Sequence, residues 1–265
     1  DSAQKKLGKM LSQQDMSLLF SFYDWLGLPM EVIELLLSYC KAICQDTAFG
    51  GIPARVLYRN SMLYCVPLVN PDGADLVAGE IPEASPEYVQ AAAIAAGFPQ
   101  IPFPDGWKAN LRGVDLNLNY PASWDLAKEI KGNLGFDRAA PRDFPGNQPL
   151  DQRETAALAA YTACIRPDIL LAYHTQGRVI YPGGRDLDPP GAKNLAEKFS
   201  EASGYAVEDV PPESSNAGFK DWFLRRFHRP GFTIEAGLGE NPLPLSQLPQ
   251  LIRENEPILA AAHAN

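Results

Sequence analysis

The sequence predicts an α/β protein with a mixed, mainly parallel sheet flanked by helices. Its 265 residues, 46% of them hydrophobic, suffice for one large domain, or for one domain with a small appendage. In the second half of the chain, strand and helix patterns alternate, as they do when helices cover both faces of a sheet. The expected elements are a helix over 151–164, strands at 168–177 and 178–182, helices over 190–203 and about 217–228, a strand at 231–237 and a helix over about 246–263.

The first half begins with a predicted α-helical hairpin. Apolar residues recur at helical spacing in SQQDMSLLFSFYDWLG (12–27), with Ser12 as candidate N-cap, and again in PMEVIELLLSYCKAIC (29–44). The Gly-Leu-Pro sequence between them predicts a turn. Further along, we expect a strand over 61–69, a turn at 70–73, a helix over 86–97 and a short alternating strand within 112–121.

Charge and composition limit the partners. With a net charge of −9 and no basic tract, the chain is a poor candidate for general nucleic-acid binding. No apolar run approaches the ~20 residues that span a bilayer, and residues 1–15 lack the pattern of a secretory signal. Four sparse cysteines predict buried free thiols in a reducing compartment. We therefore expect a cytoplasmic protein without a membrane partner.

Two polar residues end apolar strand patterns. His174 in YHTQG follows the run PDILLA, and Glu235 lies within TIEAG. Ligands of such sheets collect at the carboxyl ends of the strands, which favours a functional site there. Taken by themselves, the two residues leave a second interpretation open: a core histidine satisfied by a neighbour, and a buried carboxylate paired with an arginine.

Four segments together resemble the zinc carboxypeptidase family. In chain order they are PLVNPDG (67–73), KANLRGVDLNLNYPASW (108–124), LAYHTQGRVIYP (171–182) and FTIEAGLGENPLP (232–244). They look most like its bacterial branch of γ-D-glutamyl-diaminopimelate peptidases, which cut cell-wall stem peptides. The resemblance extends from about residue 45 to the end and implies a catalytic domain over 45–265.

The resemblance implies roles for four residues. His174 matches a zinc ligand. Glu235 matches the general base that activates the zinc-bound water and passes its proton to the leaving amine. Arg112 matches the cation that stabilises the developing oxyanion, and Asn117 matches the asparagine that binds the substrate carboxylate. The implied function is hydrolysis of peptide bonds in cell-wall-type peptides. From the residues alone, Arg112 is equally well explained as a surface loop charge.

One departure from the family concerns the substrate. Leu118 stands where exopeptidases of the family carry an arginine that pairs with a free terminal carboxylate. Losing such a pair costs about 2–5 kcal/mol in a desolvated pocket, which argues against ordinary C-terminal exopeptidase activity. Diaminopimelate offers a zwitterionic group on its side chain instead. In SSNAGFKDWF (214–223), Lys220 and Asp221 are candidate substrate contacts, with solvated helix charges as the alternative.

A second departure concerns the metal. The family's other two zinc ligands come from a His-x-x-Glu pair upstream of PLVNPDG, and this chain has no such pair. The nearest formal substitutes are Asp24 and the spaced carboxylates Glu31 and Glu34, which are more simply explained as solvated helix charges. Zinc with one imidazole and no organised partners binds weakly. The alternative to a peptidase is therefore a catalytically inactive peptidase-like domain that binds a peptide or a protein partner.

The N-terminal segment accounts for the missing pair. KLGKMLSQQDMSLLFSFYDWLGLPMEVIELLLSYC (6–40) resembles part of the helical domain of DnaD-type primosomal replication proteins. We therefore expect a helical segment over 1–44 to replace the first strands of the peptidase domain, a central strand among them. The basic and acidic residues of this segment balance, so direct DNA binding is not favoured.

Overall fold

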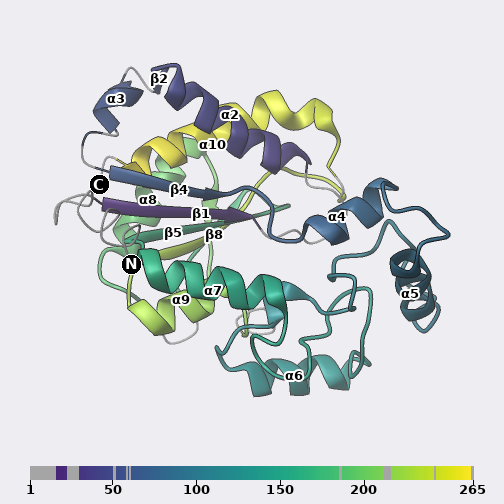
Figure 1. The fold of residues 1–265 in the computed structure, drawn as a ribbon. Helices are drawn as coiled ribbons and strands as arrows, with labels where there is room; N and C mark the ends of the chain where they lie inside the picture. The colour runs from purple at the N-terminus through teal and green to yellow at the C-terminus, as the bar shows by residue number, and fades with distance from the viewer. Residues whose placement is uncertain are drawn as a thin grey trace, which may run out of the picture.

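The fold is a six-stranded sheet between two layers of helices (Figure 1). The computed structural model describes residues 16–22, 30–49, 52–57, 59, 61–184, 187–211, 216–241 and 243–263, and for 16–22 and 30–31 it describes the backbone only. The strands are ordered β4 (Ser61–Val66), β1 (Met16–Phe22), β5 (Ile169–His174), β8 (Gly231–Glu235), β6 (Val179–Pro182) and β7 (Ala206–Val207). The first four are mutually parallel, and β6 runs antiparallel to β8. The predicted mixed, mainly parallel sheet is confirmed.

Helices cover both faces of this sheet (Figure 1). On one face lie α2 (Met30–Cys44), α8 (Ala192–Ser203) and α10 (Leu248–His263), and on the other lie α7 (Arg153–Ile165) and α9 (Phe219–Phe227). A lobe beyond the carboxyl end of β4 carries the remaining larger helices, α4 (Pro71–Ala78), α5 (Pro86–Ala95) and α6 (Trp124–Asn133). The short elements are β2 (Ala48–Phe49), β3 (Ile52–Pro53), α3 (Ala54–Leu57), η2 (Leu116–Leu118) and η4 (Leu245–Gln247).

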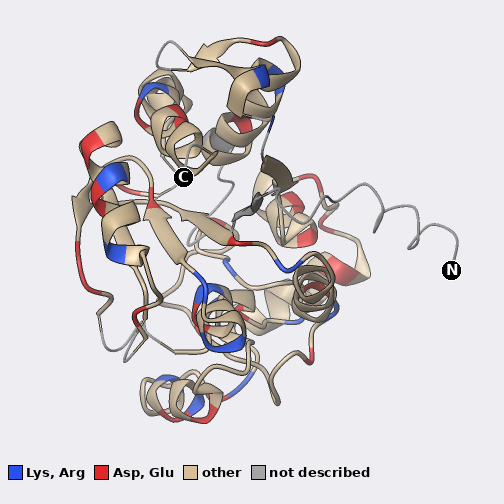
Figure 2. Ribbon diagram, turned by 90° about the vertical axis from the view of Figure 1, so that its left-hand side faces the viewer, with Lys and Arg blue, Asp and Glu red and all other residues tan. Residues whose placement is uncertain are grey.

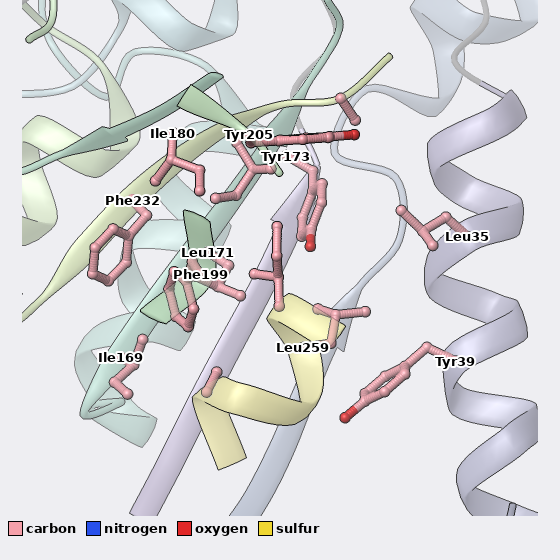
Figure 3. Close-up of a cluster of buried hydrophobic side chains, with 14 of the residues drawn as sticks. Leu35, Tyr39, Ile169, Leu171, Tyr173, Ile180, Phe199, Tyr205, Phe232 and Leu259 are labelled. Atoms are coloured by element: carbon pink, nitrogen blue, oxygen red, sulfur yellow. The ribbon is translucent and has the colours of Figure 1, made fainter. Parts of the chain in front are cut away.

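The strands alternate between two cores. Ile169, Leu171 and Tyr173 of β5 belong to the core under α2, α8 and α10 (Figure 3), whereas Leu170 belongs to the core under α7 and α9. Because successive side chains of a strand point to opposite faces, a strand inside such a sheet is apolar on both faces. All six residues of β5 are buried, which explains why its sequence reads as a continuous apolar run.

The predicted helix over 12–27 is wrong for residues 16–22, which form strand β1. This strand lies inside the sheet, parallel to β4 on one side and to β5 on the other, with Phe22 opposite Tyr173. A short apolar run fits either a helix or a buried strand, and pairing with two neighbours favours the strand here. The central strand that we expected to be missing therefore has a counterpart. The second predicted helix is confirmed as α2, and the boundary between units at residues 44 and 45 stays a prediction.

Three smaller expectations also change. The segment 112–121 forms no strand but the 3-10 turn η2, which Asp115 caps by accepting a hydrogen bond from the backbone N of Asn117. The turn at 70–73 is the start of helix α4, because the Asn70 side chain accepts a hydrogen bond from Gly73 N. Cys44 and Cys164 are exposed rather than buried, and all four cysteines are free thiols.

Acidic and basic positions are interspersed over the helices and loops (Figure 2). Among the helices that the structure describes, none is long and apolar enough to cross a membrane.

Candidate functional site

His174 and Glu235 lie side by side at the carboxyl ends of neighbouring strands. They are register partners in the parallel pair β5–β8. Ala172 and Thr233 precede them by two residues, so all four side chains lie on the same face of the sheet. These four residues form part of the wall of a cavity of about 640 Å³. The sheet therefore brings the two predicted residues to one ligand-sized cavity, although they are far apart in the sequence.

The His174 imidazole is neutral. Its residue is only 2% exposed, and burial, assisted by the charges of Lys108 and Lys220, lowers the pKa of His174 to about 3. A neutral imidazole is the form that binds a metal or accepts a hydrogen bond. A cation at this place would require a large desolvation cost.

Lys108 places a fixed positive charge in the cavity wall. Its Nζ lies 2.7 Å from Asp115 Oδ2, and the exposed fractions of the two side chains are 6% and 0%. Asp115 also accepts hydrogen bonds from the backbone N of Asn117 at 3.2 Å and of Asp143 at 3.1 Å. These bonds satisfy the buried carboxylate, which holds the ammonium group in one position.

Asn117 and Leu118 lie on the same turn and also line the cavity. The Asn117 Oδ1 accepts a hydrogen bond from Phe219 N at 3.1 Å, which orients its amide against the start of α9. Leu118 is 9% exposed. The position that carries an arginine in the family's exopeptidases is thus an apolar part of the wall in this chain.

A second group of charges lies at the cavity around Asp143. Its carboxylate bonds to Lys131 Nζ at 2.5 Å and to Arg142 Nε at 2.7 Å. Burial raises the pKa of Asp143, but the charges of Lys108, Lys131 and Arg142 outweigh burial and bring it to about 2. The sequence reasoning missed Lys108, Lys131 and Asp143 as cavity residues, because only the folded loops bring these positions together.

Lys220 and Asp221 occupy the first turn of α9 and line the same cavity. Both side chains are 6% exposed, with Lys220 Nζ lying 3.0 Å from Asp221 Oδ1. The alternative that they are solvated helix charges is therefore wrong.

Arg112 is a predicted site residue that lies outside the cavity lining. It is exposed, and it is not among the residues that line the cavity. The Asn110 side chain forms a tight turn by accepting hydrogen bonds from the backbone N of Arg112 and Val114, and Gly113 has a φ of +73°. This turn carries Arg112 at the surface, outside the cavity that His174 and Glu235 line. His174, Glu235, Asn117, Leu118, Lys220 and Asp221 do line the cavity.

The described residues do not fit a zinc ion. In the described ranges, no three His, Cys, Asp or Glu side chains are grouped so that they hold a metal, whereas zinc sites use three or four protein ligands. Among the substitutes that we considered, Glu34 is exposed on α2, and Asp24 and the Glu31 side chain lie outside the described residues. We therefore derive no reaction step that passes through zinc.

A mixed, mainly parallel sheet with an imidazole and a carboxylate at adjacent strand ends defines an α/β protein with a candidate ligand site at its strand ends. A family model described as zinc carboxypeptidase matches residues 34–257, and the chain belongs to this family. A second model, described as replication initiation and membrane attachment, matches residues 1–48. This match agrees with the resemblance of the N-terminal segment to replication proteins.

Two relatives and one solved structure illustrate the similarity. The chain is 39% identical over 235 residues to gamma-D-glutamyl-L-diamino acid endopeptidase 1 of Lysinibacillus sphaericus, a match that covers 89% of this chain and 57% of that protein. It is 34% identical over 240 residues to the uncharacterized protein YqgT of Bacillus subtilis, covering 91% of this chain and 62% of YqgT. The chain thus spans about three fifths of these relatives' lengths. Carboxypeptidase A from Helicoverpa armigera shares the fold, with a TM-score of 0.63 at 16% identity, over 97% of this chain and 63% of that structure.

Proposed function

We propose that this chain hydrolyses the γ-D-glutamyl bond of cell-wall-type peptides that contain diaminopimelate. The observation that carries the proposal is the register pairing of His174 with Glu235 in the wall of one cavity. The 39% identity to a gamma-D-glutamyl-L-diamino acid endopeptidase supports the substrate class.

Glu235 is the proposed general base. Its carboxylate removes a proton from the attacking water and delivers that proton to the leaving amine. The partly exposed Glu235 faces the cavity beside the neutral His174, so that a water bound between them lies within reach of the carboxylate. Removing the carboxylate while keeping the shape of the side chain should therefore abolish the proton transfer.

We assign the cation that stabilises the developing oxyanion to Lys108. Lys108 lines the cavity and is held by Asp115, whereas Arg112 is exposed and lies outside the cavity lining. A fixed ammonium in a partly desolvated wall stabilises developing negative charge without reorganisation. Asn117 is the proposed contact to a substrate carboxylate. Leu118 adds no charge that would require a free terminal carboxylate, so we expect peptides with and without one to be substrates.

A synthetic L-Ala-γ-D-Glu-meso-diaminopimelate tripeptide tests the proposal. We expect the full chain to release free diaminopimelate, detected by mass spectrometry, and the Glu235→Gln variant to lose this activity by a factor of about 10³ or more. Glu256→Gln is the matched control, because Glu256 lies on α10 away from the cavity lining. Absence of turnover by the folded wild-type chain, or equal turnover by Glu235→Gln, would contradict the proposal.

A second candidate function is peptide binding without hydrolysis. It is favoured by the donor set of the described residues, in which no group of three metal-binding side chains accompanies His174. Peptide affinity that is insensitive to a chelator, without turnover, would support this candidate. Turnover that a chelator abolishes would eliminate it.

A further inference from the structure

We infer that the Lys220–Asp221 ion pair recognises a zwitterionic head group at the end of the substrate's diamino acid side chain. Such a head group carries a carboxylate and an ammonium on one carbon, as diaminopimelate does and lysine does not. The inference rests on the proposed function for the identity of the substrate class, and it adds the residues that select among diamino acids.

The ion pair is built into the cavity wall. Both residues lie in the first turn of α9 and line the same cavity as His174. Each of the two side chains is only 6% exposed, and Lys220 Nζ lies 3.0 Å from Asp221 Oδ1. Taking two charges out of water is costly, and the pair stabilises a fold only when further hydrogen bonds satisfy both groups.

Both charged groups retain bonding capacity. The ammonium of Lys220 has three donors. One bonds to the carbonyl oxygen of Gly183, and the contact with the Asp221 carboxylate is an ion pair without the geometry of a hydrogen bond. Asp221 Oδ1 is buried, and among the described residues no hydrogen bond of normal geometry reaches it. A ligand that brings one acceptor and one donor would complete the bonding of both groups.

Small residues keep room beside the carboxylate. Gly218 lines the cavity, and a Cβ added there would lie 2.9 Å from Asp221 Oδ2 and 3.5 Å from Asn117 Oδ1. The backbone of Gly218 has φ −76° and ψ 158°, a conformation that any residue adopts. Glycine is thus needed at this position for space and not for its backbone freedom. A Cβ at Gly184 would similarly lie 3.2 Å from Asp221 Oδ1.

The paired charges discriminate by repulsion as well as by attraction. A side chain that ends in an ammonium alone meets the positive charge of Lys220, and one that ends in a carboxylate alone meets the negative charge of Asp221. A zwitterion places its carboxylate on the ammonium and its ammonium on the carboxylate, which favours both contacts at once. Leu118, at the same cavity, adds no third charge that would favour a lone carboxylate.

The test compares three ligands by isothermal titration calorimetry. The ligands are γ-D-Glu-meso-diaminopimelate, γ-D-Glu-L-lysine and γ-D-Glu-2-aminopimelate, which end in a zwitterion, an ammonium and a carboxylate. They are measured on the full chain carrying Glu235→Gln, so that turnover does not consume them. We expect the zwitterionic ligand to bind at least about tenfold more tightly than either of the others.

Three further substitutions, each added to the Glu235→Gln chain, test whether the Lys220–Asp221 ion pair causes the preference for the zwitterionic ligand. Lys220→Met should reduce the preference over the lysine ligand, and Asp221→Asn should reduce the preference over the aminopimelate ligand, each to less than about threefold. Gly218→Ala keeps both charges but covers the carboxylate, so it should weaken binding of the zwitterion by at least about tenfold. Lys193→Met is the matched control, because its ion pair with Asp188 is solvent-exposed, with side chains 78% and 58% exposed, and it should change nothing.

Equal affinities for the three ligands would overturn the inference, and so would a preference that survives in folded Lys220→Met and Asp221→Asn. If Lys220→Met does not fold, the affinities of Asp221→Asn and Gly218→Ala for the three ligands test the inference. A zwitterion preference without hydrolysis by the wild-type chain would overturn the proposed function alone. Hydrolysis without any preference would overturn this inference alone.

Discussion

His174 and Glu235 lie side by side on two adjacent parallel strands, as the last paired residues of β5 and β8. The imidazole is buried and neutral, and the carboxylate is only partly buried, so the two groups differ in their access to water. This difference suits a pair in which one member holds a ligand and the other moves a proton. The other charged residues of the cavity wall are Lys108, Lys131, Asp143, Lys220, Asp221 and Glu240.

Replacing Lys108 should impair turnover far more than replacing Arg112. We expect Lys108→Met to lower kcat by a factor of about 10²–10³, because it removes a fixed cation from the cavity wall. Steady-state kinetics on the tripeptide measures this effect. Arg112→Ala should change kcat by less than about twofold, since the side chain is exposed.

Lys128→Met controls for the loss of a lysine, because Lys128 is exposed on α6. A circular dichroism spectrum should establish that Lys108→Met remains folded with Asp115 uncompensated. A large loss of turnover in Arg112→Ala, with Lys108→Met fully active, would reverse the assignment.

Acid should destabilise the fold through His263. The His263 Nδ1 lies 2.7 Å from Ser61 Oγ, and burial lowers the pKa of His263 to about 4. In the unfolded chain a histidine takes up a proton near pH 6.5. The folded-state pKa is lower, so the contribution of His263 to stability is full above pH 6.5 and is lost as the pH falls toward 4, by about 3 kcal/mol. Urea unfolding at a series of pH values measures this decline.

His263→Gln should remove the His263 part of the decline between pH 6.5 and 4, because glutamine does not titrate. The decline that His174 causes, with its pKa of about 3, should remain in this variant. His228→Asn is the matched control, since His228 is exposed and asparagine tolerates its φ of +53°. An identical decline in His263→Gln and in the wild-type chain would show that another group causes it.

Asp143 should give a second, more acidic transition. Its folded-state pKa of about 2 lies below the ordinary aspartate value of 3.8, so the carboxylate stabilises the fold above pH 4. That contribution, about 2 kcal/mol, is lost as the pH falls from 4 to 2. Asp143→Asn should have a lower free energy of unfolding at pH 7 and a flatter pH dependence below pH 4.

Asp137→Asn provides the comparison for Asp143, because the Asp137 side chain is 68% exposed in its contact with Arg138. Exposed pairs contribute little to stability, so this variant should behave like the wild-type chain. Equal pH profiles for Asp143→Asn and Asp137→Asn would contradict the stabilising role of the Lys131–Asp143–Arg142 contacts.

Strand β1 should be essential to the fold. Leu19 pairs with Tyr64 of β4 and with Leu170 of β5, and a proline in a strand paired on both sides removes a ladder hydrogen bond and does not fit. We expect Leu19→Pro to lower the free energy of unfolding by about 3 kcal/mol or more, measured by urea denaturation. Unchanged stability would show that residues 16–22 do not contribute to the sheet in solution.

The sequence predicted the parts of the fold in which local pattern and tertiary context agree. The helix that became α2 and the strands that became β5 and β8 have strong periodicity or long apolar runs, and their limits were predicted closely. MSLLFSF (16–22) fits both a helix and a strand, and only its neighbours β4 and β5 decide between them.

The candidate site was predicted to the extent that chain position determines spatial position. His174 and Glu235 end strands, so the sheet itself places them. Arg112 and Lys108 lie four residues apart on a loop, and the hydrogen bonds of Asn110 and Asp115 decide which of them faces the cavity. The contacts of Asp143 with Lys131 and Arg142 depend on how two loops meet, which no local pattern encodes.

A crystal structure of the Glu235→Gln chain with the L-Ala-γ-D-Glu-meso-diaminopimelate tripeptide tests the central claim most directly. We predict density for the peptide in the cavity, with its γ-glutamyl carbonyl group beside His174 and the substituted side chain at position 235, and with its diaminopimelate head group on Lys220 and Asp221. Peptide density at any other surface, with this cavity empty at saturating peptide, would contradict the account.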